Sequence, residues 1–162
     1  FREGDWVEIG DADGRVEEIR SQVVRLRTRD NEQITVPSST ILNANVTNLS
    51  TPRFGPGIGL RCPVSLGYDV SWRQAESLLL EAAEGMDGVL EEPAPRVLVE
   101  ELGDYAVKHT LVVLVEDPQW LPKIRSELNR RILDRFHGAG IQIMSPAYVA
   151  DPDSAKLPQD VS

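Results

Sequence analysis

The stretch GDADGRVEEI, residues 10–19, fits two structures: a glycine-rich phosphate-binding loop, or a tight turn between two strands. A phosphate loop must be followed by a helix whose N-terminus faces the anion. The residues after Gly14 include β-branched side chains and no Lys-Ser or Lys-Thr, and Asp11 and Asp13 would repel a phosphate. Asp-Gly is a favoured turn dipeptide, so we predict a hairpin that turns at Asp13-Gly14.

Short alternating segments rich in Val, Ile and Thr surround this stretch, and turn residues separate them. We predict strands over residues 5–9, 15–20, 23–29, 33–36 and 41–48. Short strands at this spacing indicate a small barrel or sandwich. In the third strand, Arg25, Arg27 and Arg29 share one face, which is either solvated or meets the acidic surface of a neighbouring subunit.

Prolines and glycines interrupt this pattern at residues 55–59, where we place a linker. We therefore predict a β domain over residues 1–54, an α/β domain over 60–150 and a flexible tail over 151–162. The α/β domain has the order strand, helix, strand, strand, helix, strand, which is typical of the ferredoxin-like sandwich. The predicted fold class is thus α+β.

Two amphipathic segments predict the helices of the second domain. The first begins with a capping box at Ser71 and Gln74, and the second with Asp117 before a proline. Residues at helical spacing indicate the buried side of each helix. They are Trp72, Ala75, Leu79, Ala82 and Met86 in the first helix, and Leu121, Ile124, Leu128, Ile132 and Phe136 in the second.

Charge and motif content exclude several classes of function. The formal net charge is −9, and such a surface repels nucleic acid. His109 and His137 lack a second ligand at metal-binding spacing, and no nucleophile motif occurs, so we predict no metal, no cofactor and no enzymatic activity. We expect His109 to be a hydrogen-bonded or exposed strand residue, and Cys62 to be a buried strand residue.

An ordered set of motifs resembles the small-conductance mechanosensitive channel family, MscS. The chain reads FREGDWVEI, GRVEEI, LRTRDNE, ITVPSS and VTNLS in order, and later VSLGYD and GAGI. The family's pattern has Gly where this chain has Asn31 and Asn where it has Ser38, and both replacements suit turns. The resemblance covers residues 1 to about 150.

This resemblance implies an Sm-like (SH3-like) five-stranded β domain followed by an α/β domain. In the family, seven copies form a hollow cytosolic cage below a membrane pore, and solutes enter through openings between subunits. The pore helix would precede Phe1, in agreement with the absence of an initial Met and of a membrane segment. The implied function is the cytoplasmic part of an inner-membrane channel that opens on membrane tension and releases ions and small solutes during osmotic downshock.

Two groups of residues are candidates for function within this framework. Phe1, Arg2 and Asp5 lie nearest the pore helix and are predicted to couple it to the β domain, Arg2 and Asp5 through charge pairing. The carboxylates Glu91, Glu92, Glu100 and Glu101 are predicted to concentrate cations at the cage openings. The alternatives are a small-molecule-binding regulatory module with a ferredoxin-like domain and, against the charge, an Sm-like nucleic-acid binder.

Overall fold

The computed structural model describes residues 1–51 and 55–144. It divides into two units: residues 1–58 together with 116–120, and residues 59–115 together with the chain from 121 onward. The predicted flexible tail at 151–162 lies outside the described residues. Both units combine antiparallel strand pairs with helices, so the α+β class is confirmed.

The first unit is a five-stranded sheet with the order β4-β3-β2-β1-β5. Its elements are β1 (Trp6–Ile9), β2 (Ala12–Ile19), β3 (Val23–Arg27), β4 (Gln33–Pro37), helix α1 (Ser38–Leu42) and β5 (Val46–Asn48). Alternate residues of the strands point to one interior, as the period of two requires. The buried cluster they form is Val7, Ile9, Val16, Val24, Leu26 and Val36.

The predicted turn at Asp13-Gly14 is wrong, because the chain reverses three residues earlier. Ile9 pairs with Ala12, which leaves Gly10 and Asp11 as the two residues of the loop. Gly10 has φ +58, a conformation that glycine adopts without steric cost. Asp13 and Gly14 are instead strand residues of β2 opposite Glu8 and Val7.

The predicted strand over residues 41–48 is also partly wrong. Its first part belongs to α1, and only Val46–Asn48 forms a strand, which pairs with β1. A helix of five residues is too short to show a 3.6-residue period, so the sequence pattern carried no signal for it.

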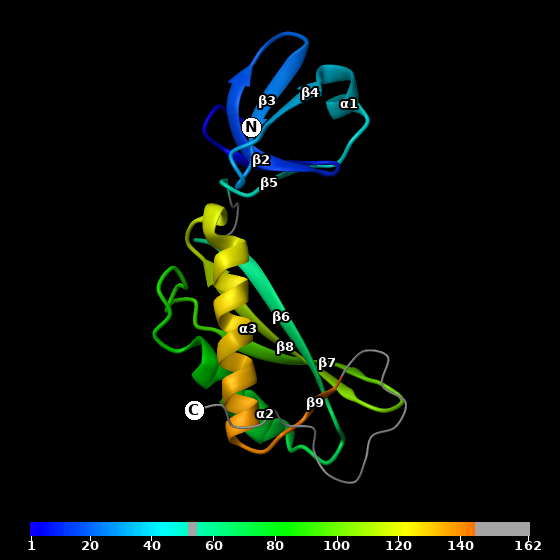
Figure 1. Ribbon diagram of the computed structural model, residues 1–162, viewed down its shortest axis with the longest axis vertical. Coiled ribbons are helices and arrows are strands. Elements are labelled where there is room, and N and C mark those ends of the chain that lie inside the picture. Colours follow the sequence, from blue (N-terminus) through cyan, green and yellow to red (C-terminus); the bar gives the residue numbers. More distant parts are fainter. Residues whose placement is uncertain (52–54, 145–162) are drawn as a thin grey trace. The chain divides into compact units, whose positions relative to one another are not determined.

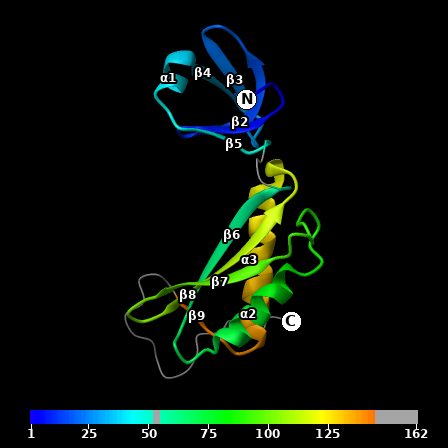
Figure 2. The ribbon, with the colours of Figure 1, turned by 180° about the vertical axis from the view of Figure 1, so that it is seen from behind.

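The second unit is a four-stranded sheet with two helices on one face (Figure 1). Its elements are β6 (Ile58–Leu66), α2 (Trp72–Ala83), β7 (Arg96–Leu102), β8 (Val107–Val115), α3 (Leu121–Gly138) and β9 (Ile143–Met144). A 3-10 turn (Pro118–Trp120) comes between β8 and α3 in the sequence and belongs to the first unit. The strand order is β7-β8-β6-β9. Figure 2, from behind, presents the sheet face that the helices leave uncovered.

The core of the second unit lies between this sheet and the two helices. Ile124, Leu128, Ile132 and Phe136 of α3 are buried, as the predicted helical stripe requires, and Ala75, Leu79 and Ala82 of α2 lie in the same cluster. Cys62 of β6 is buried there too, and burial raises the pKa of its thiol. The predicted interior of both helices is therefore largely confirmed.

Two details of α2 differ from the prediction. Ser71 occupies the N-cap position, but its side chain makes no capping hydrogen bond, so the capping box does not form. Trp72 is 48 % exposed rather than buried, and the guanidinium of Arg73 lies 4.3 Å from its ring centroid. The first buried residue of α2 is Ala75, so Trp72 precedes the buried side of the helix.

Candidate functional site

The N-terminal residues form a tight turn that the Asp5 carboxylate closes. The Asp5 amide donates to the Arg2 carbonyl (3.1 Å), and Asp5 Oδ2 accepts from the Arg2 amide (3.0 Å) and from Asn48 Nδ2 (2.9 Å). Gly4, with φ +92, supplies the left-handed conformation that this turn needs. The Arg2 amide, followed by the Asn48 amide, lowers the pKa of Asp5.

Backbone hydrogen bonds attach this turn to the sheet. The Gly4 amide donates to the Val16 carbonyl (2.7 Å), and the Val16 amide donates to the Asp5 carbonyl (2.8 Å). The structure therefore brings Arg2 and Asp5 together, through the Arg2 main chain rather than its guanidinium. Phe1 is 43 % exposed at the end of the turn.

The three arginines of the third predicted strand are each paired within the chain. Arg25 contacts Glu18 (2.8 Å), Arg27 contacts Glu17 (2.8 Å), and Arg29 pairs with Asp13. The Arg27 guanidinium, followed by the Gln33 amide, lowers the pKa of Glu17. These partners lie on β2, so the row of arginines is neutralised by its own sheet.

Trp6 joins one of these pairs into a cluster that the sequence did not indicate. Its indole is 4 % exposed, and its Nε1–H donates to Asp13. The Arg29 guanidinium lies 4.3 Å from the Trp6 ring centroid, within cation–π distance. The contact between Trp6 and Asp13 depends on the register that places Asp13 on β2, opposite Glu8. The sequence analysis placed Asp13 in a turn and therefore did not predict this contact.

The four candidate carboxylates lie in two places on the second unit. Glu91 and Glu92 are exposed in the segment between α2 and β7, whereas Glu100 and Glu101 are near the end of β7. Glu100 pairs with Arg61 of β6 and lies 3.9 Å from Lys108 Nζ of β8. Glu91 and Glu92 therefore make no ion pair among the described residues, whereas the charge of Glu100 is largely compensated.

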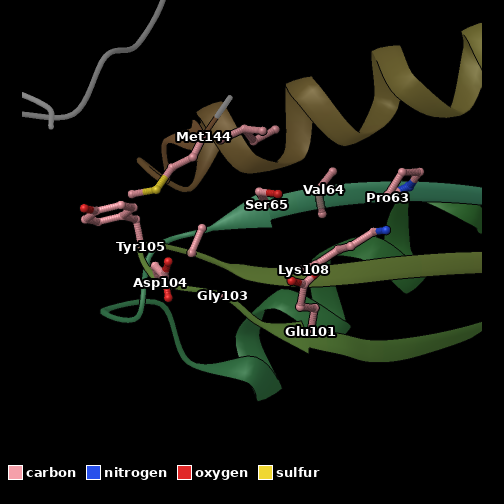
Figure 3. A pocket seen from close by; sticks show the side chains of 11 residues that line it. Pro63, Val64, Ser65, Glu101, Gly103, Asp104, Tyr105, Lys108 and Met144 are labelled. Atoms are coloured by element: carbon pink, nitrogen blue, oxygen red, sulfur yellow. The ribbon is translucent and has the colours of Figure 1, made fainter. Parts of the chain in front are cut away.

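Glu101 borders a groove at the far end of the sheet (Figure 3). The groove has a volume of about 600 Å³, within the range of small-molecule sites. Its lining comes from the end of β6, the β7–β8 hairpin and β9. The lining residues are Pro63, Val64, Ser65, Glu101, Gly103, Asp104, Tyr105, Ala106, Lys108, Ile143 and Met144.

His109 differs from its predicted environment. It is 1 % exposed, and its Nδ1 has no hydrogen-bond partner, so it is neither exposed nor fully hydrogen-bonded. Burial lowers its pKa. His137 lies in the last turn of α3, where a positive charge is favourable.

The described residues hold neither a cluster of metal ligands nor a helix that could cross a membrane. Nowhere in residues 1–51 and 55–144 do three His, Cys, Asp or Glu side chains gather as a metal site would require. None of the helices in this described part of the chain combines the length and the apolar character needed to cross a bilayer.

Two family models match consecutive parts of the chain. The model described as "Mechanosensitive ion channel, beta-domain" matches residues 1–51, and "Mechanosensitive ion channel MscS, C-terminal" matches residues 58–143. Solved structures share the fold. The closed-state crystal structure of Helicobacter pylori MscS has a TM-score of 0.73 at 19 % identity, over 95 % of this chain and 60 % of that one. Arabidopsis thaliana MSL1 has a TM-score of 0.61 at 17 % identity, over 90 % and 53 %.

Curated relatives carry the same family name. Small-conductance mechanosensitive channel MscMJ of Methanocaldococcus jannaschii is 30 % identical, over 91 % of this chain and 42 % of the relative. Miniconductance mechanosensitive channel MscM of Escherichia coli is 26 % identical, over 91 % of this chain and 13 % of the relative. This chain therefore spans less than half the length of either relative.

The two matched domains, in this order, define a component of a mechanosensitive ion channel. The chain belongs to the MscS family, because the model of the MscS C-terminal domain alone covers more than half of its 162 residues. The resemblance seen in the sequence motifs is thereby confirmed.

Proposed function

We propose that this chain is the cytosolic region of an MscS-family channel that opens on membrane tension and releases ions and small solutes during osmotic downshock. The observation that supports this most directly is the match of the β-domain and C-terminal models to residues 1–51 and 58–143, in that order. In this proposal the region supplies assembly and solute filtering, while the rest of the protein supplies the pore in the inner membrane. It performs no enzymatic reaction and uses no cofactor.

We further propose that the first unit is an Sm-like barrel over residues 1–54 and that the second is a ferredoxin-like sandwich over 60–150, joined by a linker at 55–59. The strand order β4-β3-β2-β1-β5 around one apolar interior supports the first assignment. The βαββαβ element order and the sheet order β7-β8-β6-β9 support the second. Strand β6 starts at Ile58, so its first two residues overlap with the last two residues of this linker.

The N-terminal turn is proposed to couple the pore helix to the β domain through Phe1, Arg2 and Asp5. Rigid attachment is the property that such a coupling needs, and the bonds from Gly4 and Asp5 to Val16 supply it. The Asp5 carboxylate also holds Asn48 of β5. A displacement of the chain before residue 1 would therefore reach two strands of the first unit.

A double-mutant cycle in the full-length channel tests this coupling. In addition to the main-chain bond from Arg2, the Arg2 charge acts on the Asp5 carboxylate across the turn and lowers its pKa. We therefore expect Arg2→Gln and Asp5→Asn each to change the membrane tension needed for opening, and the double variant to change it by less than their sum. Glu3→Gln is the matched control, because Glu3 is an acidic residue of the same turn. Its carboxylate accepts a hydrogen bond from the Ile19 amide (3.2 Å) rather than from Arg2. Simple additivity of Arg2→Gln and Asp5→Asn would contradict charge pairing.

The four carboxylates Glu91, Glu92, Glu100 and Glu101 are proposed to favour cations at the openings between subunits. Their ion pairs within the chain suggest an order for the size of their effects. Glu91 and Glu92 make no ion pair among the described residues, whereas Glu100 contacts Arg61 and Lys108. An uncompensated charge sets a stronger local potential. We therefore expect Glu91→Gln/Glu92→Gln to shift the reversal potential of the full-length channel in a salt gradient more than Glu100→Gln does. An unchanged reversal potential in all variants, Glu101→Gln included, would contradict the proposal.

Assembly into a homo-oligomer of seven copies is the remaining part of the proposal. Light scattering of the purified chain measures the mass of its assembly directly. A sevenfold mass supports the cage. A stable assembly with another number of copies would contradict the seven-copy arrangement. A monomer would show that assembly depends on the membrane part of the protein.

A further inference from the structure

Residues 116–120, which join β8 to α3, belong to the first unit, although both neighbouring elements belong to the second. The chain therefore passes from one unit to the other at residues 58–59, 115–116 and 120–121. Residues 117–120 form a compact turn, because the Asp117 carboxylate accepts from the Gln119 amide (2.9 Å) and the Asp117 carbonyl accepts from the Trp120 amide (3.1 Å). An attachment of this turn to the first unit also fixes the chain from which α3 begins.

The Arg29 guanidinium makes this attachment. Its Nη2 donates to the Pro118 carbonyl (2.7 Å), and its Nε donates to the Gln119 carbonyl (3.1 Å). Hydrogen bonds from a charged donor are stronger than those between neutral groups. A helical residue four positions after Pro118 would normally donate to its carbonyl, but Pro122 has no amide hydrogen. Arg29 thus supplies a donor to a carbonyl that residue 122 cannot satisfy.

The same guanidinium is also bound to β1 and β2. Its Nη1 donates to Asp13 of β2, and its central carbon lies 4.3 Å from the centroid of the Trp6 ring of β1. The Trp6 Nε1–H donates to the same carboxylate, so Asp13 joins the two side chains. Partners in three directions and contact with an aromatic face suit a planar guanidinium and not a lysine ammonium. We call the side chains of Trp6, Asp13 and Arg29 the Arg29 clasp.

The Arg29 clasp is continuous with the N-terminal turn. Trp6 directly follows Asp5, whose carboxylate closes that turn, and Trp6 is buried in the first unit. From Trp6, bonded side chains lead through Asp13 and Arg29 to the Pro118 carbonyl. A displacement of the N-terminal turn therefore has an unbroken series of contacts along which it can reach the start of α3.

The linker at residues 55–59 is less suited to transmit such a displacement. Gly55 and Gly57 have φ +79 and +81, and among the described residues nothing lies within 4 Å of a Cβ atom added at Gly55 or Gly59. Glycines with open space around them change conformation at little cost. Such a segment absorbs a displacement more easily than the hydrogen-bonded Arg29 clasp does.

We propose that Arg29 is a positioning residue, which makes residues 116–120 a second route, besides the linker, from the N-terminal turn to the second unit. This route rests on the proposed channel function, whereas the Arg29 clasp itself does not. A displacement of the pore helix then reaches α3 through the Arg29 clasp, and the second unit resists that displacement. Loss of the Arg29 clasp removes this resistance, so the channel opens at lower tension.

Arg27 provides a matched control for Arg29. Both arginines pair with a carboxylate of β2, Arg27 with Glu17 and Arg29 with Asp13. Arg27 also donates to the Asn31 carbonyl (3.0 Å), in the connection between β3 and β4, and not to the turn before α3. A glutamine at either position therefore removes one guanidinium and one ion pair, but only Arg29→Gln also releases the turn before α3.

Amide hydrogen exchange in the purified chain, measured by nuclear magnetic resonance, tests the Arg29 clasp. We expect Arg29→Gln to speed exchange of the Gln119 and Trp120 amides on the order of 10-fold, because the turn that contains them is released. Arg29→Lys keeps the charge without the planar fork and should have a smaller effect. Arg27→Gln should leave both amides unchanged, and the amides of β1 and β2 should keep their protection in all three variants.

Recordings from the full-length channel test the route. We expect Arg29→Gln to shift half-maximal opening to lower tension, and its combination with Asp5→Asn to have less than the sum of the two effects. Both changes interrupt the same series of contacts, so the second change has less left to remove. Arg27→Gln and Asp5→Asn should be additive, because Arg27 lies outside this series.

Unchanged exchange at Gln119 and Trp120 in Arg29→Gln, or equal acceleration in Arg27→Gln, would overturn the proposal. Faster exchange throughout β1 and β2 in Arg29→Gln would make Arg29 a general stabiliser of the first unit and would overturn its positioning role. Additive effects of Arg29→Gln and Asp5→Asn on tension, or no effect of Arg29→Gln beside a clear effect of Asp5→Asn, would overturn the route. A full-length protein that does not open under tension would contradict the channel function instead, and the exchange measurement would still decide the Arg29 clasp.

Discussion

Gly14 shows how a single position in a strand can fix the packing of the first unit. A Cβ atom there would lie 2.8 Å from the Arg27 carbonyl oxygen, closer than such contacts occur, and 3.2 Å from Leu26 Cβ, which is also tight. The neighbour is backbone of the paired strand β3, so relief requires displacement of the ladder between β2 and β3. The glycine is needed here for space rather than for a turn.

We therefore predict that Gly14→Ala destabilises the protein by about 2 kcal/mol, the typical cost of forced overpacking. Gly59→Ala is the control, because Gly59 is a strand residue of β6 with no atom within 4 Å of the added Cβ. It should be neutral or stabilise by up to about 1 kcal/mol through the unfolded chain. Urea unfolding followed by circular dichroism measures both, and similar midpoints for the two variants would contradict the steric argument.

The buried His109 gives the stability of the protein a dependence on pH. Its folded-state pKa is lowered by burial, whereas the unfolded value is the ordinary 6.5. The unfolded chain therefore binds more protons as the pH falls through 6.5, and the free energy of unfolding decreases until the folded-state pKa has also been passed.

We predict that the free energy of unfolding is lower at pH 5.5 than at pH 7.5 and that His109→Leu removes most of this difference. The leucine also removes an unpartnered buried Nδ1, so the variant should lose little stability at pH 7.5. Urea midpoints at the two pH values give the comparison, and an unchanged difference in His109→Leu would assign the effect to other groups.

At the scale of elements, the beginnings of the two long helices are stabilised differently. The Ser71 side chain makes no capping bond to α2, whereas Asp117 Oδ1 accepts from the Gln119 amide (2.9 Å) in the turn that leads into α3. A side chain that satisfies a free amide at a helix start contributes about 1 kcal/mol. The two positions have similar sequence signals but different geometry.

We predict that Asp117→Ala costs about 1 kcal/mol and that Ser71→Ala costs less than about 0.5 kcal/mol. The order is the reverse of what the capping-box pattern at Ser71 and Gln74 implies. Guanidinium unfolding curves of the two variants, with shared slopes, measure the difference. A larger loss for Ser71→Ala would show that its hydroxyl caps the helix in solution.

The sequence predicted the long elements well because they repeat a physical period. Ile124, Leu128, Ile132 and Phe136 recur every four residues and are all buried. The second half of β8, residues 111–115, is continuously apolar, and β8 lies inside the sheet. Features without a period were missed. Helix α1 has five residues, and the turn at Gly10-Asp11 competed with an equally plausible Asp13-Gly14.

The candidate sites also differ in how much of them the sequence could predict. Arg2 and Asp5 are three residues apart, so their proximity could be predicted from opposite charges close together in the sequence, without knowledge of the fold. The groove collects residues from four separate segments, β6, β7, β8 and β9, and only the sheet order places them side by side. Likewise, the sequence showed a row of arginines but not the register that gives each one a partner on β2.

At the scale of the whole molecule, two features determine how copies of the chain interact electrostatically. They are the net charge of −9 and the internal pairing of Arg25, Arg27 and Arg29. Arginines that are already neutralised by β2 offer little attraction to the acidic surface of another copy. Copies of the chain therefore repel one another through their net charge, and that repulsion is screened as ionic strength rises.

We predict that self-association of the chain strengthens between 20 mM and 500 mM NaCl. Assembly through free arginines on acidic partners would weaken over the same range, so the sign of the salt effect separates the two mechanisms. Sedimentation velocity at a fixed protein concentration measures it as the weight-average sedimentation coefficient. Glu91→Gln/Glu92→Gln removes two uncompensated negative charges and should reduce the salt dependence, because less repulsion remains to be screened. Dissociation at high salt would show that ion pairs between copies dominate, and that the pairs within β2 and β3 exchange for them on assembly.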